Sequence, residues 1–339
     1  MKVCVLMGGM SSEYDISVKS GTNVASGLAE MEHEVCIALV SRAGKWRFSD
    51  EYLHTASSVR NFISSDDGVF GHGEDAAAQW RKMDVEVVFP ALHGPWGEDG
   101  RIQGFLDICG FPWVGSSVSG SAVSNDKLLT KYVLRANALP TADYTVLRTG
   151  YDRKYEDIIE VPCVLKSPCQ GSSFGLAVVK TREDLKVKLA EIMELEGIVL
   201  IEKFVRGREI TCGVLRKSDG SLQALPPTEI VPKVSDYFDF KAKYETGGSD
   251  EITPARITPE QTLTIQNYAV KVHEILGMGT LSRTDFILTS DDEYFILESN
   301  ALPGFTQTSL YPQAAAVAGW SFNEIVDLLV KNAARPLNG

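Results

Sequence analysis

Ser282-Arg-Thr-Asp-Phe-Ile-Leu288 is followed by the acidic pair Asp291-Asp292 and then by Glu293-Tyr-Phe-Ile-Leu-Glu-Ser-Asn-Ala-Leu-Pro-Gly304. Two apolar runs on either side of an acidic turn are typical of a β-hairpin with buried strands. A turn centred on the acidic pair fixes which side chains face each other across the hairpin. The expected pairs are Ser290 with Glu293, Asp285 with Glu298, and Arg283 with Asn300.

This hairpin predicts a cation site. Side chains two apart on one strand share a face, so Glu298 and Asn300 lie on the same surface as Asp285. Two carboxylates directly opposite one another repel, and burying them unpaired costs still more. A hard divalent cation removes that penalty, and two carboxylates with an amide oxygen suit Mg²⁺ that bridges to phosphates. The alternative is a structural ion pair in which Arg283 alone satisfies both acids.

Length and composition are those of an ordinary globular protein. The chain has 339 residues, of which 44% are hydrophobic and 23% charged. Its net charge of −12 argues against binding to nucleic acids or anionic membranes, because such a surface repels polyanions. The apolar run before Gly8-Gly9 is too short for a signal peptide or a membrane span, so we expect a cytoplasmic protein. The six cysteines lack CxxC spacing, which favours reduced thiols over disulfides or zinc.

The first third of the chain alternates strand, helix and strand. We expect strands at residues 2–7, 34–40 and 85–92, and a helix at 17–31. That order predicts a parallel, Rossmann-like sheet that binds ligands at the carboxyl ends of its strands. The two loops that leave those ends are Gly8-Gly-Met-Ser-Ser-Glu13 and His93-Gly-Pro-Trp-Gly-Glu-Asp-Gly100.

The rest of the chain predicts two further α+β regions. The second region has an expected helix at 124–136, strands at 161–165 and 197–204, and a helix at 183–196 between them. The third has a strand at 209–215, a polar loop at about 232–253, a helix at 259–276, the hairpin, and a final helix at 322–332. We therefore expect three domains, at residues 1–117, 118–203 and 204–339.

Two short segments of the second region have the composition of a nucleotide site. Lys166-Ser-Pro-Cys-Gln-Gly-Ser-Ser-Phe-Gly175 offers a lysine and a flexible loop whose N–H groups suit phosphate oxygens. It is not a Walker A loop, because its lysine precedes the glycines. The strand end Glu202-Lys-Phe-Val205 offers backbone groups to an adenine edge. Taken alone, each segment is equally typical of an ordinary turn or of a strand leaving the core.

In chain order, these motifs resemble the ATP-grasp enzymes and, within them, the D-alanine–D-alanine ligases. The resemblance extends over essentially the whole chain. It rests on the motifs Gly8-Gly-Met-Ser-Ser-Glu13, Ser17 to Gly21, Leu92-His-Gly94, Gly97-Glu-Asp-Gly100, Asn125-Asp-Lys127, Gln170-Gly-Ser-Ser173, Ser282-Arg-Thr-Asp285, Glu298-Ser-Asn-Ala-Leu-Pro-Gly304 and Thr308-Ser-Leu310. It implies a Rossmann-like N-terminal domain followed by two α+β domains that enclose the nucleotide.

The resemblance also implies an activity. In that family ATP phosphorylates the carboxylate of one D-alanine, and the amine of a second D-alanine attacks the acyl phosphate. The expected product is D-alanyl-D-alanine for peptidoglycan, and hence for the cell wall and cell shape, with release of ADP. The implied cofactors are ATP and two Mg²⁺ ions, with Mn²⁺ as a substitute, and the implied assembly is a homodimer.

Individual site residues follow from the same resemblance. The residues implied to bind ATP are Lys127, Lys166, Ser172, Ser173 and Lys243 at the phosphates, Glu202, Lys203, Phe204 and Val205 at adenine, and Glu209 at the ribose. The implied Mg²⁺ ligands are Asp285, Glu298 and Asn300. The implied substrate and catalytic groups are Glu13 for the first ammonium, a Glu13–Ser172–Tyr244 hydrogen-bond set, His93, Arg283 and the Gly304 N–H for the oxyanion, and Ser309 for the second carboxylate.

Three rival functions remain open at this point. Within the same fold, the alternative is a ligase that joins D-alanine to D-lactate or to another small partner; Tyr244 favours D-alanine, because the family's ester-forming members tend to lack this tyrosine. A non-catalytic ATP-binding regulator is disfavoured because Lys166, Arg283 and the metal-binding set are intact. A Rossmann-type dehydrogenase is disfavoured because Gly8-Gly9 lacks the Gly-x-Gly-x-x-Gly spacing.

Overall fold

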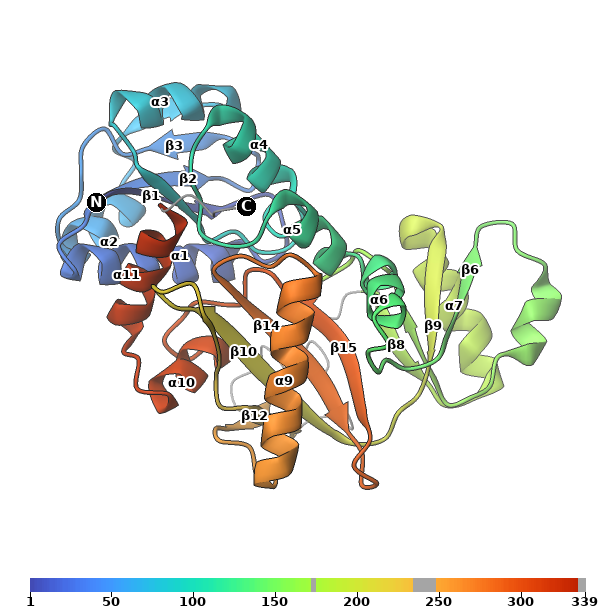
Figure 1. Ribbon diagram of the computed structural model, residues 1–339. Coiled ribbons are helices and arrows are strands. Elements are labelled where there is room, and N and C mark those ends of the chain that lie inside the picture. Colours follow the sequence, from blue (N-terminus) through green and yellow to red (C-terminus); the bar gives the residue numbers. More distant parts are fainter. Residues whose placement is uncertain (172–174, 234–247, 335–339) are drawn as a thin grey trace.

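The computed structural model describes residues 1–171, 175–233 and 248–334 (Figure 1). Three sheets follow one another along the chain, each with helices packed on it. Ser172, Ser173, Lys243 and Tyr244, all of them predicted site residues, lie outside the described residues.

The first sheet has the strand order β4-β3-β2-β1-β5. β1 runs parallel to both β2 and β5, which confirms the predicted Rossmann-like arrangement, while β3 and β4 add an antiparallel edge. The strands are β1 (Lys2–Gly8), β2 (Glu34–Val40), β3 (Trp46–Phe48), β4 (Val69–Gly71) and β5 (Val87–Pro90). The helices of this part are α1 (Tyr14–Glu30), α2 (Ala56–Ser64), α3 (Ala76–Lys82), α4 (Arg101–Cys109) and α5 (Val118–Asn125).

The second sheet is antiparallel, with the order β6-β9-β7-β8. Its strands are β6 (Tyr144–Arg148), β7 (Cys163–Lys166), β8 (Leu176–Val179) and β9 (Ile198–Lys203), and its helices are α6 (Lys127–Ala136) and α7 (Arg182–Glu196). The third sheet has the order β13-β12-β10-β14-β15, with β11 paired to β10. Its elements are β10 (Arg208–Arg216), β11 (Leu222–Ala224), β12 (Thr228–Pro232), β13 (Ser249–Ile252), β14 (Leu281–Leu288), β15 (Tyr294–Asn300), α9 (Pro259–Ile275), α10 (Leu310–Val317) and α11 (Phe322–Ala333).

The single helix expected at 124–136 is wrong. α5 ends at Asn125 and α6 begins at Lys127, with Asp126 between them in an extended conformation. The Asp126 side chain accepts hydrogen bonds from the N–H groups of Leu128 and Leu129. An aspartate that caps a helix in this way satisfies the first free donors, so it starts a new helix. The break places Lys127 at the first turn of α6.

The predicted hairpin is present, and its register is confirmed where the charged residues lie. Arg283 pairs with Asn300 and Asp285 with Glu298. The predicted pairing of Ser290 with Glu293 is wrong, because the Thr289 N–H donates to the Glu293 carbonyl across a turn in which Asp292 has a φ of 60°. A register shift between Asp285 and Phe286, with one extra residue on β15, restores the predicted pairs further on.

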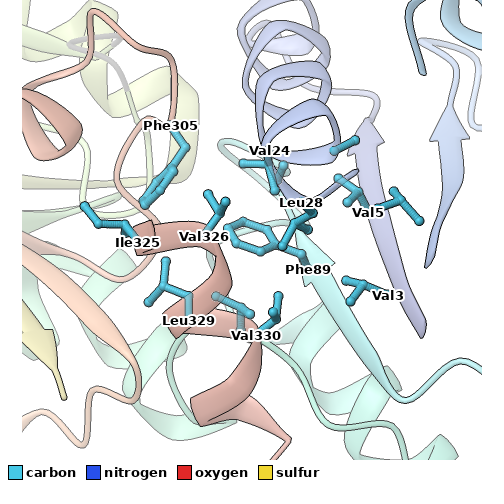
Figure 2. Close-up of a cluster of buried hydrophobic side chains, with 14 of the residues drawn as sticks. Val3, Val5, Val24, Leu28, Phe89, Phe305, Ile325, Val326, Leu329 and Val330 are labelled. Carbon is cyan, nitrogen blue, oxygen red and sulfur yellow. The ribbon is translucent and has the colours of Figure 1, made fainter. Parts of the chain in front are cut away.

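The last helix returns to the first sheet. α11 packs beside α1, which brings the last described helix of the chain against the first (Figure 1). Figure 2 shows the shared core, in which Val326 and Leu329 of α11 lie among the buried side chains of β1, α1 and β5. The His33 Nε2 lies 2.8 Å from Asp327 Oδ1 beside this core. This packing joins the first and third sheets into one body.

A second contact between these parts leaves no room for a side chain. A Cβ added to Gly279 would lie 2.0 Å from the carbonyl oxygen of Gly115. We therefore expect Gly279→Ala to lower the free energy of unfolding by about 1–3 kcal/mol, because the backbone must move apart. Gly104→Ala in α4 is the matched control, since its Cβ meets nothing closer than 3.8 Å. Urea unfolding should show the loss in the first variant only; equal midpoints in both would contradict the expectation.

Candidate active site

A cleft of about 1130 Å³ is lined by residues from all three sheets. Every predicted site residue that the structure describes lines it, although the sequence places them far apart. They are Glu13, His93, Lys127, Lys166, Glu202, Lys203, Phe204, Val205, Glu209, Arg283, Asp285, Glu298, Asn300, Gly304 and Ser309. The fold therefore brings the described part of the predicted set into one cavity.

The first sheet contributes Glu13 and His93 from the loops at the carboxyl ends of β1 and β5. A Cβ on Gly94 would lie 2.9 Å from Glu13 Oε2, and one on Gly171 would lie 3.7 Å from the same oxygen. The Glu13 carboxylate thus reaches from the first sheet to the loop that follows β7. His93 is buried, with its Nε2 3.2 Å from the Ser20 hydroxyl. Both groups sit at the edge where a Rossmann-like sheet binds ligands.

The second sheet and α6 contribute a buried cluster of charged side chains at the cleft. Lys166 of β7 and Glu202 of β9 face each other, with Nζ 3.0 Å from Oε2. The other oxygen of Glu202 lies 3.2 Å from the Nζ of Lys131, which is fully buried on α6. Lys131 is not among the site residues predicted from the sequence. Its position one helical turn after Lys127 was the available signal.

The pKa values in this cluster follow from burial and pairing. Burial lowers the pKa of Lys131 to about 8, against the opposing pull of Glu202. Burial alone would raise the pKa of Glu202, but the two lysines hold it below its ordinary value. Burial likewise works against the charged form of Lys166, yet Glu202 and Glu298 raise its pKa. Lys166 and Glu202 are therefore charged near neutral pH, and Lys131 is the member closest to losing its proton.

The end of β9 offers a backbone donor that matches adenine. The Glu202 side chain next to it is already engaged, because the Lys131 ammonium lies 3.2 Å from Glu202 Oε1 and also donates to the Thr141 hydroxyl. Three residues further on, the Val205 N–H has no backbone acceptor among the described residues. Adenine presents ring-nitrogen acceptors, so one of them would satisfy this free N–H at the strand end.

The hairpin carries the polar face predicted from its sequence. The Arg283 guanidinium makes two hydrogen bonds of 2.9 Å to the two oxygens of Asp285, and the Thr211 hydroxyl donates to Asp285 Oδ1 at 2.6 Å. Asn300 Nδ2 donates to Asp285 Oδ2 at 3.2 Å. Burial disfavours the charged guanidinium, but Asp285 raises the pKa of Arg283 above its ordinary value.

Lys127 connects this face with the loop after β7. Its Nζ donates to the Gln170 carbonyl at 2.8 Å and lies 3.6 Å from Glu298 Oε2. This differs from the structural alternative, in which Arg283 alone satisfies both acids, because a lysine of α6 approaches Glu298. The arrangement places positive charge beside the carboxylates that face the cleft.

The hairpin residues fit a hard divalent cation. No group of three or more His, Cys, Asp or Glu side chains is close enough to hold a metal within residues 1–171, 175–233 and 248–334. The donor set here is two carboxylates and one amide, from Asp285, Glu298 and Asn300. About a third of the Glu298 side chain is exposed to the cleft. Oxygen donors with room for phosphate and water suit Mg²⁺ better than a closed site would.

The far end of the cleft lies at the start of α10. Ser309 precedes the first turn, and its hydroxyl accepts from the Thr306 N–H at 3.0 Å. Glu251 of β13 also lines this end, and the Gln313 side chain on α10 donates to it at 3.0 Å. Burial raises the pKa of Glu251. This carboxylate is not among the predicted site residues, because β13 has no apolar alternation and falls inside the expected polar loop.

Solved structures of similar fold define the class of protein. The D-alanine–D-alanine ligase from Coxiella burnetii matches with a TM-score of 0.80 and 26% identity, over 98% of this chain and 93% of that one. The VanG D-Ala:D-Ser ligase from Enterococcus faecalis matches with a TM-score of 0.82 and 26% identity, over 98% and 99% of the two chains. Together with the cleft between three sheets, these likenesses define an enzyme of the ATP-grasp fold, and specifically a ligase.

Sequence comparisons narrow the class to one family. The family model described as D-ala D-ala ligase N-terminus matches residues 2–116, and the one described as D-ala D-ala ligase C-terminus matches residues 133–331. The D-alanine–D-alanine ligase of Leptospira interrogans strain 56601 is 38% identical over 97% of each chain. That of Desulfotalea psychrophila is 41% identical over 98% of this chain and 94% of its own. The chain therefore belongs to the D-alanine–D-alanine ligase family.

No helix in the described part of the chain is long and apolar enough to cross a membrane. The six cysteines, all of which are described, are unpaired, as expected from their spacing.

Proposed function

We propose that this enzyme joins two D-alanines into D-alanyl-D-alanine for peptidoglycan, with ATP converted to ADP through an acyl phosphate. The observation that carries the proposal is the composition of one cleft. One end offers buried lysines and the Val205 N–H, which has no backbone acceptor among the described residues, and the other begins at the N-terminus of α10. Between them lies the oxygen-rich face of the hairpin. This order suits a nucleotide, a transferring phosphate and a second substrate placed in a row.

In the part of the cleft proposed to bind ATP, positively charged side chains are already held in position. Lys127 and Lys166 line the cleft and would bind phosphate oxygens, and Glu209 would bind the ribose hydroxyls. Phosphoryl transfer to a carboxylate brings two anions together, so preorganised positive charge lowers its barrier. Lys243, Ser172 and Ser173 belong to the same proposal on sequence alone.

We propose that Asp285, Glu298 and Asn300 hold Mg²⁺, with a second ion shared with the nucleotide and Mn²⁺ as a substitute. When bound, Mg²⁺ neutralises charge on the β- and γ-phosphates. The protein's own part is to fix the ligands. Thr211 and Arg283 hold Asp285 in one orientation, and the pairing of β14 with β15 places Glu298 directly opposite it. Second partners of this kind are what keep a metal ligand in place.

The acceptor half stabilises the carbonyl that is attacked. Arg283 and the Gly304 N–H would face the oxyanion, and Glu13 would hold the first ammonium. A Cβ on Gly304 would lie 3.1 Å from the Ser309 hydroxyl, so the backbone approaches that group closely. Ser309 and the free N–H groups at the start of α10 would bind the second carboxylate, because a helix N-terminus favours anions. His93 would complete the first-substrate pocket.

The choice of acceptor is tested by product analysis. Purified enzyme with ATP and Mg²⁺ should release phosphate with D-alanine alone and form D-alanyl-D-alanine, identified by mass spectrometry. Given equal D-alanine, D-lactate and D-serine at neutral pH, it should still make mainly this dipeptide, whereas L-alanine should give no product. D-alanyl-D-lactate or D-alanyl-D-serine as the main product would assign it to the alternative acceptor class, in which the VanG D-Ala:D-Ser ligase falls by its name.

We further propose that the chain works as a cytoplasmic homodimer, with no nucleic-acid or membrane partner, and that its domains are residues 1–117, 118–203 and 204–339. The support for these boundaries is that the three sheets are formed by successive parts of the chain. Limited proteolysis should cut near residues 117 and 203 before it cuts within a sheet.

A further inference from the structure

We propose that Lys131 is a positioning residue that controls nucleotide binding through Glu202. The proposal rests on the proposed function, because it assumes that this cleft binds ATP. Lys131 does not line the cleft, whereas both Glu202 and Lys166 do. It therefore has to act on the nucleotide through a neighbour, and its ion-pair partner is the buried carboxylate of Glu202, 3.2 Å away.

Neutralising Glu202 does not require Lys131. Lys166 already lies 3.0 Å from the same carboxylate, and burying a second ammonium is costly. With Lys131 on one oxygen and Lys166 on the other, the carboxylate shares its charge between them. The Nζ of Lys166 is then less tightly held and remains available to phosphate oxygens in the cleft. Without Lys131, the single remaining pair would bind Lys166 more firmly to Glu202 and leave Oε1 unpaired.

Lys131 is itself held from three sides. Its Nζ donates to the Thr141 hydroxyl at 2.7 Å, and that hydroxyl donates to the Ile296 carbonyl at 3.0 Å. Its Nζ also lies 5.4 Å from the centre of the Tyr144 ring. Ile296 is on β15, two residues before Glu298. The chain of contacts therefore sets Glu202 relative to the hairpin that carries the other end of the nucleotide site.

The test is calorimetric binding of ADP to the full chain in the presence of Mg²⁺. Lys131→Met should weaken ADP binding about tenfold or more, because a buried charge that orients its partner is lost. The matched control is Arg135→Met, one turn further along α6, which removes a partly exposed positive charge that lies over the same Tyr144 ring but pairs with Asp143 instead. It should change the affinity less than about twofold.

A double-mutant cycle shows whether the effect passes through Glu202. In a Glu202→Gln background, Lys131→Met should weaken ADP binding less than about threefold further, because the carboxylate it acts on has gone. Equal losses in both backgrounds, or an affinity of Lys131→Met within twofold of the wild type, would overturn the proposal. If Lys131 were only structural, Lys131→Met would lower the unfolding midpoint, and its effect on ADP affinity would not depend on the presence of the Glu202 carboxylate.

A measurement on the wild type covers the case in which Lys131→Met does not fold. The charged groups that face Lys131 are Glu202, Lys166 and Arg135, with the Tyr144 ring beside them. Since burial lowers the pKa of Lys131 to about 8, its charge is lost as the pH rises through that value. The phosphates of ADP are already ionised above neutral pH, so ADP affinity should fall between about pH 7 and 9. Constant affinity over this range would contradict the proposal.

The two proposals fail in different ways. A chain that binds ADP with the predicted Lys131 dependence but makes no dipeptide would overturn the proposed reaction alone. Normal dipeptide synthesis by Lys131→Met, with unchanged ADP affinity, would overturn the role of Lys131 and leave the reaction standing.

Discussion

Glu298→Gln is expected to lower turnover by about 100-fold or more while leaving the fold intact. Glutamine keeps the size of the side chain but removes the charge that faces Asp285 across the hairpin, that Lys127 approaches, and that is proposed to hold Mg²⁺. Steady-state phosphate release at several Mg²⁺ concentrations is the measurement. Because the carboxylate repulsion across the hairpin is also relieved, the thermal midpoint should stay the same or rise slightly.

Glu293→Gln is the matched control for this variant. Glu293 lies on the same hairpin, just before β15, and its side chain is exposed outside the cleft. It should retain full turnover and the wild-type dependence on Mg²⁺. Near-normal turnover of Glu298→Gln at ordinary Mg²⁺ concentration would remove the proposed metal assignment. Direct Mg²⁺ binding measured by calorimetry in the presence of ADP separates a lost ligand from a general loss of activity.

Arg283→Lys should lower turnover by about 100-fold to 1000-fold, with ADP affinity changed far less. Lysine keeps the positive charge but cannot make the two parallel hydrogen bonds that Arg283 makes to Asp285. The proposed oxyanion donor is then displaced, and Asp285 is left partly unsatisfied in a buried position. We expect an accompanying loss of about 1–3 kcal/mol in unfolding free energy. Kinetics with saturating ATP and D-alanine, together with urea unfolding, measure the two effects.

The control is Arg256→Lys, which changes the same residue type in an ion pair between the exposed Arg256 side chain and Glu229 of β12. It should keep its turnover, since Arg256 does not line the cleft. If Arg283→Lys turns over within a few fold of the wild type, the oxyanion role proposed for Arg283 is wrong. A fall in turnover that tracks only the loss of folded protein would point to a structural ion pair instead.

Several parts of the site could be predicted because they depend on local periodicity. Alternation along a strand put Asp285, Glu298 and Asn300 on one face, and the register of the charged pairs followed from the position of the turn. The turn itself was misplaced by one residue. A bulge on β15 compensates for that shift, so two irregularities cancel where the charged residues lie. The four predicted residues outside the described chain stay predictions.

Other features were missed because local pattern does not encode them. The break at Asp126 depends on a side chain that caps a new helix, which a continuous polar–apolar pattern hides. Glu251 lies on a short polar strand whose place in the sheet comes from pairing with β12 rather than from its own composition. The return of α11 to the first sheet is set by long-range packing (Figure 1).

The sequence by itself determined the class of fold, the polar face of the hairpin and, through its ordered motifs, the family. Only the tertiary structure decided which charges share an environment. Lys131 and Glu202 are distant in sequence, and their local patterns indicate only a lysine on a helix and an acidic residue at the end of a strand. Folding buries both and places them 3.2 Å apart, and burial lowers the pKa of this lysine to about 8. The physical reason is that hydrogen-bond periodicity is local to a segment, whereas desolvation depends on every segment that packs around a group.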